Sequence, residues 1–171
     1  MSRRTIGLVL SGGGALGAYE VGVLSHLAEE LPELLERVRV VTGSSIGAVN
    51  AAYLASRGLA PAAVKDLADL WGSMKIDELV SASPLSALRM LGTAPLRLVV
   101  RGVRSPATGL LDPGGLWLLA DRNIDWAGLH DNVSSGRFDA VALAATEIGS
   151  GRTHVFVEGR RPARALESGR M

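Results

Sequence analysis

The sequence from residue 39 to residue 52 reads RVVTGSSIGAVNAA, and this stretch decides the fold. Its first residues predict a buried strand and its last residues a helix with small side chains, joined by a tight turn. The turn spells Gly43-x-Ser45-x-Gly47, the pattern of a nucleophile elbow, in which a serine stands clear of a sheet. Glycine on either side avoids the Cβ atoms that would clash where strand and helix close together. The competing interpretation is an ordinary turn in which Ser45 caps the helix, because serine is common at that position.

A second glycine-rich stretch lies upstream of this turn. Residues 5–10 predict a short buried strand, residues 11–17 read SGGGALG, and residues 15–30 have the spacing of a helix. With the strand at residues 38–41 they predict a strand–helix–strand unit, whose two strands are parallel and joined by a right-handed crossover. The carboxyl ends of such strands meet at one edge of the sheet, which puts the loop beside Ser45. The backbone N–H groups of Gly12, Gly13 and Gly14 can then donate hydrogen bonds to an oxyanion formed when Ser45 attacks a carbonyl.

The same loop also matches a dinucleotide-binding fingerprint. Gly12-x-Gly14-x-x-Gly17 follows a predicted strand and precedes a predicted helix, as that fingerprint requires. The fingerprint also needs an acidic residue at the end of the second strand to hold a ribose, and here that strand ends without Asp or Glu. A nucleotide-binding Rossmann domain therefore stays an alternative, and ribose-dependent affinity for NAD would identify it.

The two glycine motifs, in this order and at this separation, resemble those of the patatin-like phospholipase family. The resemblance is carried by residues 12–19, GGGALGAY, and residues 43–51, GSSIGAVNA; it is strong over residues 5–57 and weaker beyond. The family consists of lipid acyl hydrolases that use a Ser–Asp dyad without histidine. The resemblance implies a phospholipase A or esterase type of activity on a lipid or phospholipid ester. It also implies that Ser45 is the nucleophile and that the backbone of Gly12–Gly14 forms the oxyanion hole, although Leu16 stands where the family often has Arg or Lys.

The sequence departs from the family at the second catalytic residue. The family's aspartate lies in an Asp-Gly-Gly or Asp-Gly-Ala motif after the strand near residue 138, and no such tripeptide occurs here. Asp112, in Asp-Pro-Gly-Gly, comes before that strand and is typical of a turn. We therefore expect the dyad aspartate beyond residue 171, and little or no hydrolysis by these residues alone. A catalytically inactive membrane-docking or interaction module, which would bind vesicles without turnover, is a further alternative.

Histidine could take the aspartate's place as a base. Two pairs follow Ser45 in the order that a hydrolase triad requires, Asp112 with His130 and Asp139 with His154. His130 is predicted on a surface helix, and His154 at the start of a strand beside polar neighbours. We therefore favour the interpretation that both histidines are exposed to solvent and take no part in catalysis.

Composition limits the other classes of function. The net charge is +1, so no global field favours nucleic acid. The chain has no cysteine and only three scattered histidines, so we expect no metal and no cofactor. No run reaches the ~18–20 apolar residues of a membrane span, and the N-terminus lacks the features of a signal peptide. We expect a cytoplasmic protein whose membrane contact, if any, is peripheral.

Residues 79–111 differ in character from the rest of the chain. They hold no acidic residue and combine leucines with four arginines, Arg89, Arg97, Arg101 and Arg104. We expect a cap insertion, which either packs its leucines on the sheet with the arginines outward or faces a membrane, where the arginines meet anionic head groups. The whole chain, residues 1–171, is then a single, incomplete patatin-like domain. Its predicted fold is three-layer α/β, a mainly parallel sheet flanked by helices and truncated at the C-terminus.

Overall fold

The computed structural model describes residues 5–74, 120–147 and 149–160. The chain splits into two compact units, one made of residues 1–72 and 123–171 and the other of residues 73–122. The first unit holds every strand that the structure describes, together with both glycine motifs. The cap expected at residues 79–111, its four arginines and Asp112 lie outside the described residues, so the predictions made for them stay predictions.

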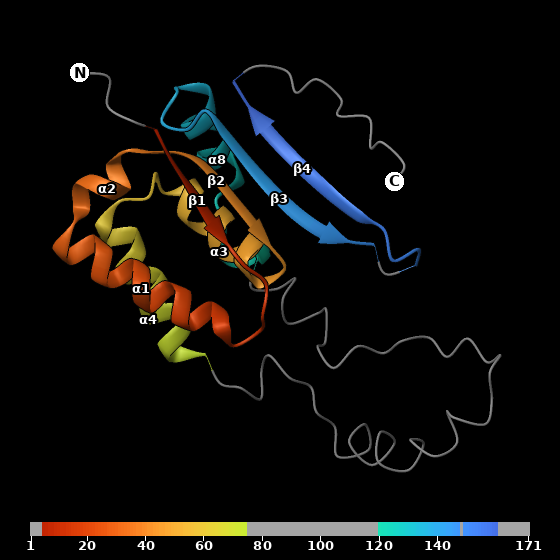
Figure 1. Cartoon of the computed structure of the whole chain (residues 1–171), viewed down its shortest axis with the longest axis horizontal. Helices are drawn as coiled ribbons and strands as arrows, with labels where there is room; N and C mark the ends of the chain where they lie inside the picture. Colours follow the sequence, from red (N-terminus) through yellow and green to blue (C-terminus); the bar gives the residue numbers. More distant parts are fainter. Residues whose placement is uncertain (1–4, 75–119, 148, 161–171) are drawn as a thin grey trace, which may run out of the picture. The chain divides into compact units, whose positions relative to one another are not determined.

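A four-stranded sheet forms the centre of the first unit (Figure 1). Its strands lie side by side in the order β1 (Ile6–Leu10), β2 (Val38–Ser44), β3 (Ala140–Thr146) and β4 (Thr153–Gly159). The first three strands are parallel, and β4 pairs with β3 in the antiparallel direction. The predicted parallel pairing of the first two strands is confirmed, and so is the strand predicted to start near His154, which is β4.

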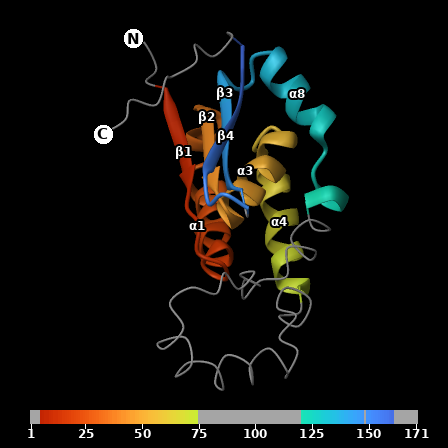
Figure 2. The same ribbon diagram turned by 90° about the vertical axis from the view of Figure 1, so that its right-hand side faces the viewer.

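Helices pack against one face of this sheet. They are α1 (Leu16–Glu30), α2 (Pro32–Glu36), α3 (Ile46–Ser56), α4 (Pro61–Ser73) and α8 (Trp126–Ser134). The order β1-β2-β3 advances in one direction, so right-handed crossovers put both connections on the same face. Figure 2 shows α3, α4 and α8 on one side of the strands. The central helix is α3, which contacts β1, β2 and β3 and is buried throughout residues 50–56. Within the part of the chain that the structure describes, no helix is long and apolar enough to cross a membrane.

Apolar side chains also lie on the opposite face of the sheet, and no helix of the described residues covers them. Strand pairing aligns Val9, Thr42, Ala142 and Val157 in one row across the four strands. Val9 is 70% exposed and Val157 is 49% exposed. Mainly parallel sheets normally have helices on both faces, which is why their strands are apolar on both. The predicted α/β class with flanking helices is confirmed, and the described residues contribute one of the two helical layers that a three-layer fold has.

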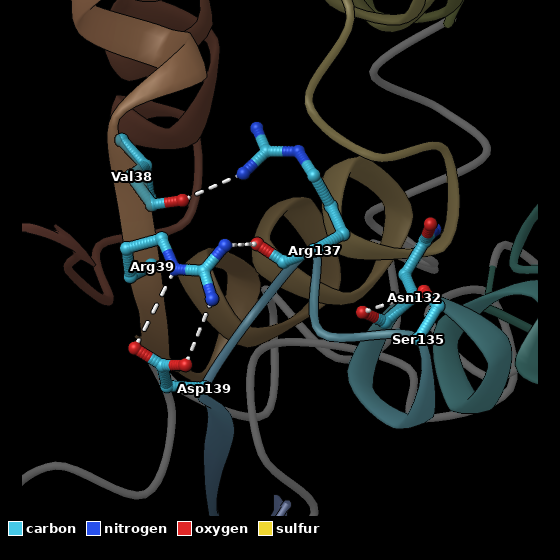
Figure 3. Close-up of polar contacts among 6 residues, drawn as sticks. All are labelled: Val38, Arg39, Asn132, Ser135, Arg137 and Asp139. Carbon is cyan, nitrogen blue, oxygen red and sulfur yellow. Dashed lines mark hydrogen bonds and ion pairs between the residues drawn. The ribbon is translucent and has the colours of Figure 1, made fainter.

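Arginine side chains connect neighbouring segments at the end of the sheet where β2 and β3 begin (Figure 3). Arg39 donates to Asp139 Oδ1 from Nη2 at 2.9 Å and to the Arg137 carbonyl oxygen from Nη1 at 3.0 Å. Arg137 donates in turn to three main-chain carbonyls, those of Leu35, Val38 and Gly58. Burial lowers the pKa of Arg137, and the charge of Arg39 lowers it further. The hydrogen bonds to the carbonyls compensate this guanidinium for the water that it loses.

Candidate active site

Ser45 is the residue that joins β2 to α3. Its φ is 53° and its ψ is −126°, a backbone conformation that residues with side chains rarely adopt. Such conformations cost roughly 1–3 kcal/mol, persist only where the surrounding structure enforces them, and cluster at functional sites. Ser45 is exposed, and its side chain makes no capping hydrogen bond to α3. The interpretation of this hydroxyl as a helix cap is therefore wrong.

Gly43 and Gly47 allow strand and helix to meet at this turn. A Cβ atom at Gly43 would overlap the main-chain carbonyl of Gly47. A Cβ atom at Gly47 would overlap the carbonyl oxygens of Leu10 and Ser11, where β1 ends. These neighbours are backbone atoms, which cannot move aside as a flexible side chain can. Steric crowding thus accounts for both glycines, as the sequence pattern predicts.

The glycine loop lies directly against Ser45. A Cβ atom at Gly12 would stand 3.1 Å from the Ser45 Cβ and 3.4 Å from the Ser44 carbonyl oxygen. Gly13 and Gly14 have φ angles of 152° and 59°, which glycine adopts without steric cost. The predicted proximity of the loop and Ser45 is confirmed.

Several backbone N–H groups of this loop are free to donate. The Ser11 N–H is taken up by Glu20 Oε1 at 2.6 Å. No residue in the described part of the chain accepts a hydrogen bond from the N–H groups of Gly12, Gly13 or Gly14. These three glycines precede α1, so their N–H groups add to the positive end of that helix.

The start of α3 contributes to the same region. The N–H group of Ile46, the first residue of α3, has no intrahelical partner because of its position. An exposed serine hydroxyl between two helix N-termini, with free N–H donors nearby, suits a carbonyl oxygen that gains negative charge. The arrangement can therefore bind the oxyanion of an acyl-transfer reaction.

A buried amide holds three helices in place behind this turn. Asn50 is 1% exposed. Its Nδ2 donates to the Gly17 carbonyl oxygen at 3.2 Å, and its Oδ1 accepts from Trp71 Nε1 at 3.0 Å. Asn50 thus connects α3 to α1 and α4. Sequence reasoning missed both Asn50 and Glu20. For Asn50 the sequence offers a signal, because it is a single amide among the small apolar residues of α3.

The histidines and Asp139 have partners other than Ser45 in the described structure. His130 Nδ1 is 2.6 Å from Glu158 Oε1, and His154 Nε2 is 3.6 Å from Glu147 Oε2. Asp139 pairs with Arg39 at the edge where the parallel strands begin, whereas Ser45 follows the opposite end of β2. A triad that links Asp139 to His154 is therefore wrong. Among residues 5–74, 120–147 and 149–160, no carboxylate or imidazole is hydrogen-bonded to the Ser45 hydroxyl.

Several known proteins are similar to this chain. Among curated proteins, "Putative sporulation hydrolase CotR" of Bacillus subtilis (strain 168) is 43% identical over 49 residues, 29% of this chain and 15% of CotR. Two structures of ExoU in complex with SpcU, from the type III secretion system of Pseudomonas aeruginosa, are also similar. Their TM-scores are 0.48 and 0.46 at 24% and 26% identity, over 91% of this chain in each case. The chain spans 35% and 33% of those two ExoU chains.

A family model also matches most of the chain. The model described as patatin-like phospholipase matches residues 8–161. The matched residues run from β1 past the end of β4 and include both the glycine loop and the turn around Ser45. The chain therefore belongs to the patatin-like phospholipase family.

Proposed function

We propose that this chain carries the nucleophile and the oxyanion hole of a serine acyl hydrolase that acts on lipid esters, of the phospholipase A or esterase type. One observation carries the proposal: the exposed, strained Ser45 stands against a loop whose Gly12, Gly13 and Gly14 N–H groups have no partner among the described residues. Membership of the patatin-like phospholipase family supports the lipid substrate class.

The reaction proceeds in two halves. Ser45 Oγ attacks the ester carbonyl carbon and gives its proton to a general base, while the N–H groups of Gly12–Gly14 bind the oxygen that becomes negative. The ester C–O bond breaks, the alcohol leaves with the proton from the base, and an acyl-enzyme ester remains on Ser45. Water then attacks this ester, gives a proton to the same base, and releases a fatty acid as Ser45 regains its hydrogen.

The base in this proposal is the aspartate of a Ser–Asp dyad. The sequence has no Asp-Gly-Gly or Asp-Gly-Ala motif, and the described residues bring no carboxylate into hydrogen-bond contact with Ser45. A serine without a base is a weak nucleophile. We therefore expect slow or no hydrolysis by the 171 residues alone and full activity in a longer chain that supplies the aspartate.

Exposed apolar side chains beside the glycine loop support a substrate with acyl chains. Leu16 and Tyr19, in the first turns of α1, are 64% and 73% exposed. Leu16 also packs against Gly13, since a Cβ atom there would meet the Leu16 side chain at 3.0 Å. An apolar chain that extends from the ester over these residues would remove them from water.

Labelling by a fluorophosphonate probe tests the proposal. The probe phosphonylates an activated serine, and Ser45→Ala is the control that removes the target. The samples are the 171-residue chain and a longer form that carries an Asp-Gly-Gly or Asp-Gly-Ala motif. Labelling of the longer form alone would support the dyad. Labelling of both would indicate a base within the 171 residues and would make Asp112 a candidate for it. Absence of labelling in both would contradict the hydrolase proposal.

The two alternatives predict different binding. A nucleotide-binding domain would hold the ribose of NAD with an acid at the end of β2, but β2 ends Thr42-Gly43-Ser44. An inactive module would bind vesicles without turnover. Peripheral membrane contact through Arg89, Arg97, Arg101 and Arg104 is compatible with the hydrolase as well, and we keep it as part of the proposal.

A further inference from the structure

Glu20 reaches from the second turn of α1 back to the loop that follows β1. Its Oε1 accepts the Ser11 N–H at 2.6 Å across nine residues of sequence. Ser11 immediately precedes Gly12, and its carbonyl oxygen lies where Gly47 would carry a Cβ. Hydrogen bonds from a backbone N–H to a carboxylate are shorter and stronger than those between neutral groups. Ser11, the residue before the three glycines, therefore contacts Glu20 through its N–H group and the start of α3 through its carbonyl oxygen.

The second carboxylate oxygen of Glu20 is unusual for a helix-surface glutamate. Glu20 Oε2 is buried and has no hydrogen-bond partner among the described residues. A buried carboxylate oxygen without a partner is costly, and a side chain turned to solvent would avoid that cost. The contact with Ser11 thus holds Glu20 in a position in which one carboxylate oxygen is shielded from solvent.

We propose that Glu20 is a positioning residue for the oxyanion-binding loop, an inference that rests on the proposed function. Glu20 takes up the Ser11 N–H and anchors the entry to three consecutive glycines, which have more backbone freedom than any other residues. The three glycine N–H groups then remain free and in place beside Ser45. Donors for an oxyanion must be held in place before the reaction, and a misplacement of about 1 Å costs on the order of 10² in rate.

A simpler role would be electrostatic support of α1. An acidic side chain near a helix N-terminus stabilises the helix through its dipole, and α1 has no capping side chain and no acid in its first turn. That role predicts a change in stability alone. Positioning predicts in addition a change at the Ser11 amide and in the reactivity of Ser45, so the two roles can be separated.

The test compares Glu20→Ala, Glu20→Gln and the matched control Glu29→Ala, with NMR and thermal unfolding on the 171-residue chain and probe labelling on the longer form that carries the Asp-Gly-Gly or Asp-Gly-Ala motif. Glu29 is an exposed glutamate near the other end of α1. Glutamine keeps the length of the side chain and an oxygen acceptor, whereas alanine removes both. NMR follows hydrogen exchange and the proton shift of the Ser11 amide, a fluorophosphonate probe reports the reaction rate of Ser45, and thermal unfolding reports the fold.

In Glu20→Ala we expect fast exchange at the Ser11 amide and a labelling rate ~10–100-fold lower. Glu20→Gln should restore protection and keep the labelling rate within about threefold of the parent, and Glu29→Ala should change neither. A protected Ser11 amide in Glu20→Ala, or equal defects in the alanine and glutamine variants, would overturn the inference. Absence of labelling in the unsubstituted longer form would count against the proposed hydrolase, and the Ser11 amide would still decide whether Glu20 anchors the loop.

Discussion

At the residue scale, the turn around Ser45 depends on positions that cannot carry a side chain. Gly47 lies in the first turn of α3, and a Cβ atom there would overlap the carbonyl oxygens of Leu10 and Ser11. We expect Gly47→Ala to destabilise the fold by roughly 1–3 kcal/mol, because overpacking forces the backbone to shift. Urea unfolding measures this change.

A helical glycine in open space provides the matched control. Gly22, in α1, has no atom within 4 Å of a Cβ built on it. Gly22→Ala should therefore stabilise the chain by ~0.5–1 kcal/mol, since alanine loses less backbone freedom on folding. Equal stability of Gly47→Ala and the parent chain would contradict the steric argument.

At the element scale, Asn50 joins the helix that follows Ser45 to α1 and α4. Asn50→Ala removes the acceptor of the half-buried Trp71 Nε1 and one of the two donors to the buried Gly17 carbonyl, which keeps its bond within α1. We expect a total loss of ~1–3 kcal/mol in the free energy of unfolding, the range for one buried polar group left unsatisfied. Trp71→Phe removes the donor to Asn50 Oδ1 and should lower the free energy of unfolding by about as much as one unsatisfied group. Trp126, which is 49% exposed, is the control, and Trp126→Phe should change stability by less than about 0.5 kcal/mol. Equal effects of the two tryptophan substitutions in urea unfolding would argue against the network.

The bounds of the strands show what local pattern misses at this scale. Apolar residues predict a second strand over residues 38–41, but β2 continues to Ser44 because its last residues pair with β3 as far as Ala144. The third strand is predicted from Phe138, whereas β3 begins at Ala140. Arg137 and Asp139, which precede β3, instead accept hydrogen bonds from Arg39. Pairing with distant residues decides both bounds, and composition cannot reveal it.

At the scale of the whole molecule, the four arginines between residues 79 and 111 predict attraction to anionic membranes. Lys and Arg near such a surface contribute ~1 kcal/mol each, so replacing Arg89, Arg97, Arg101 and Arg104 with glutamate should weaken vesicle binding by orders of magnitude. Sedimentation with vesicles that contain anionic lipid measures the change, and vesicles of neutral lipid alone are the control. Unchanged binding to anionic vesicles would reject a membrane-facing role for these residues.

The sequence by itself determined the parallel pairing of β1 and β2 and the position of the glycine loop beside Ser45. Both follow from chain connectivity and from the handedness of the crossover, which are properties of adjacent segments. Only the tertiary structure decided that Glu20 holds the loop, that Asn50 joins three helices and that Asp139 belongs to Arg39 instead of a triad. These contacts join residues 9, 33 and 100 positions apart. The partner of a polar side chain depends on which groups the folded chain brings within hydrogen-bond distance, and local pattern does not encode that distance.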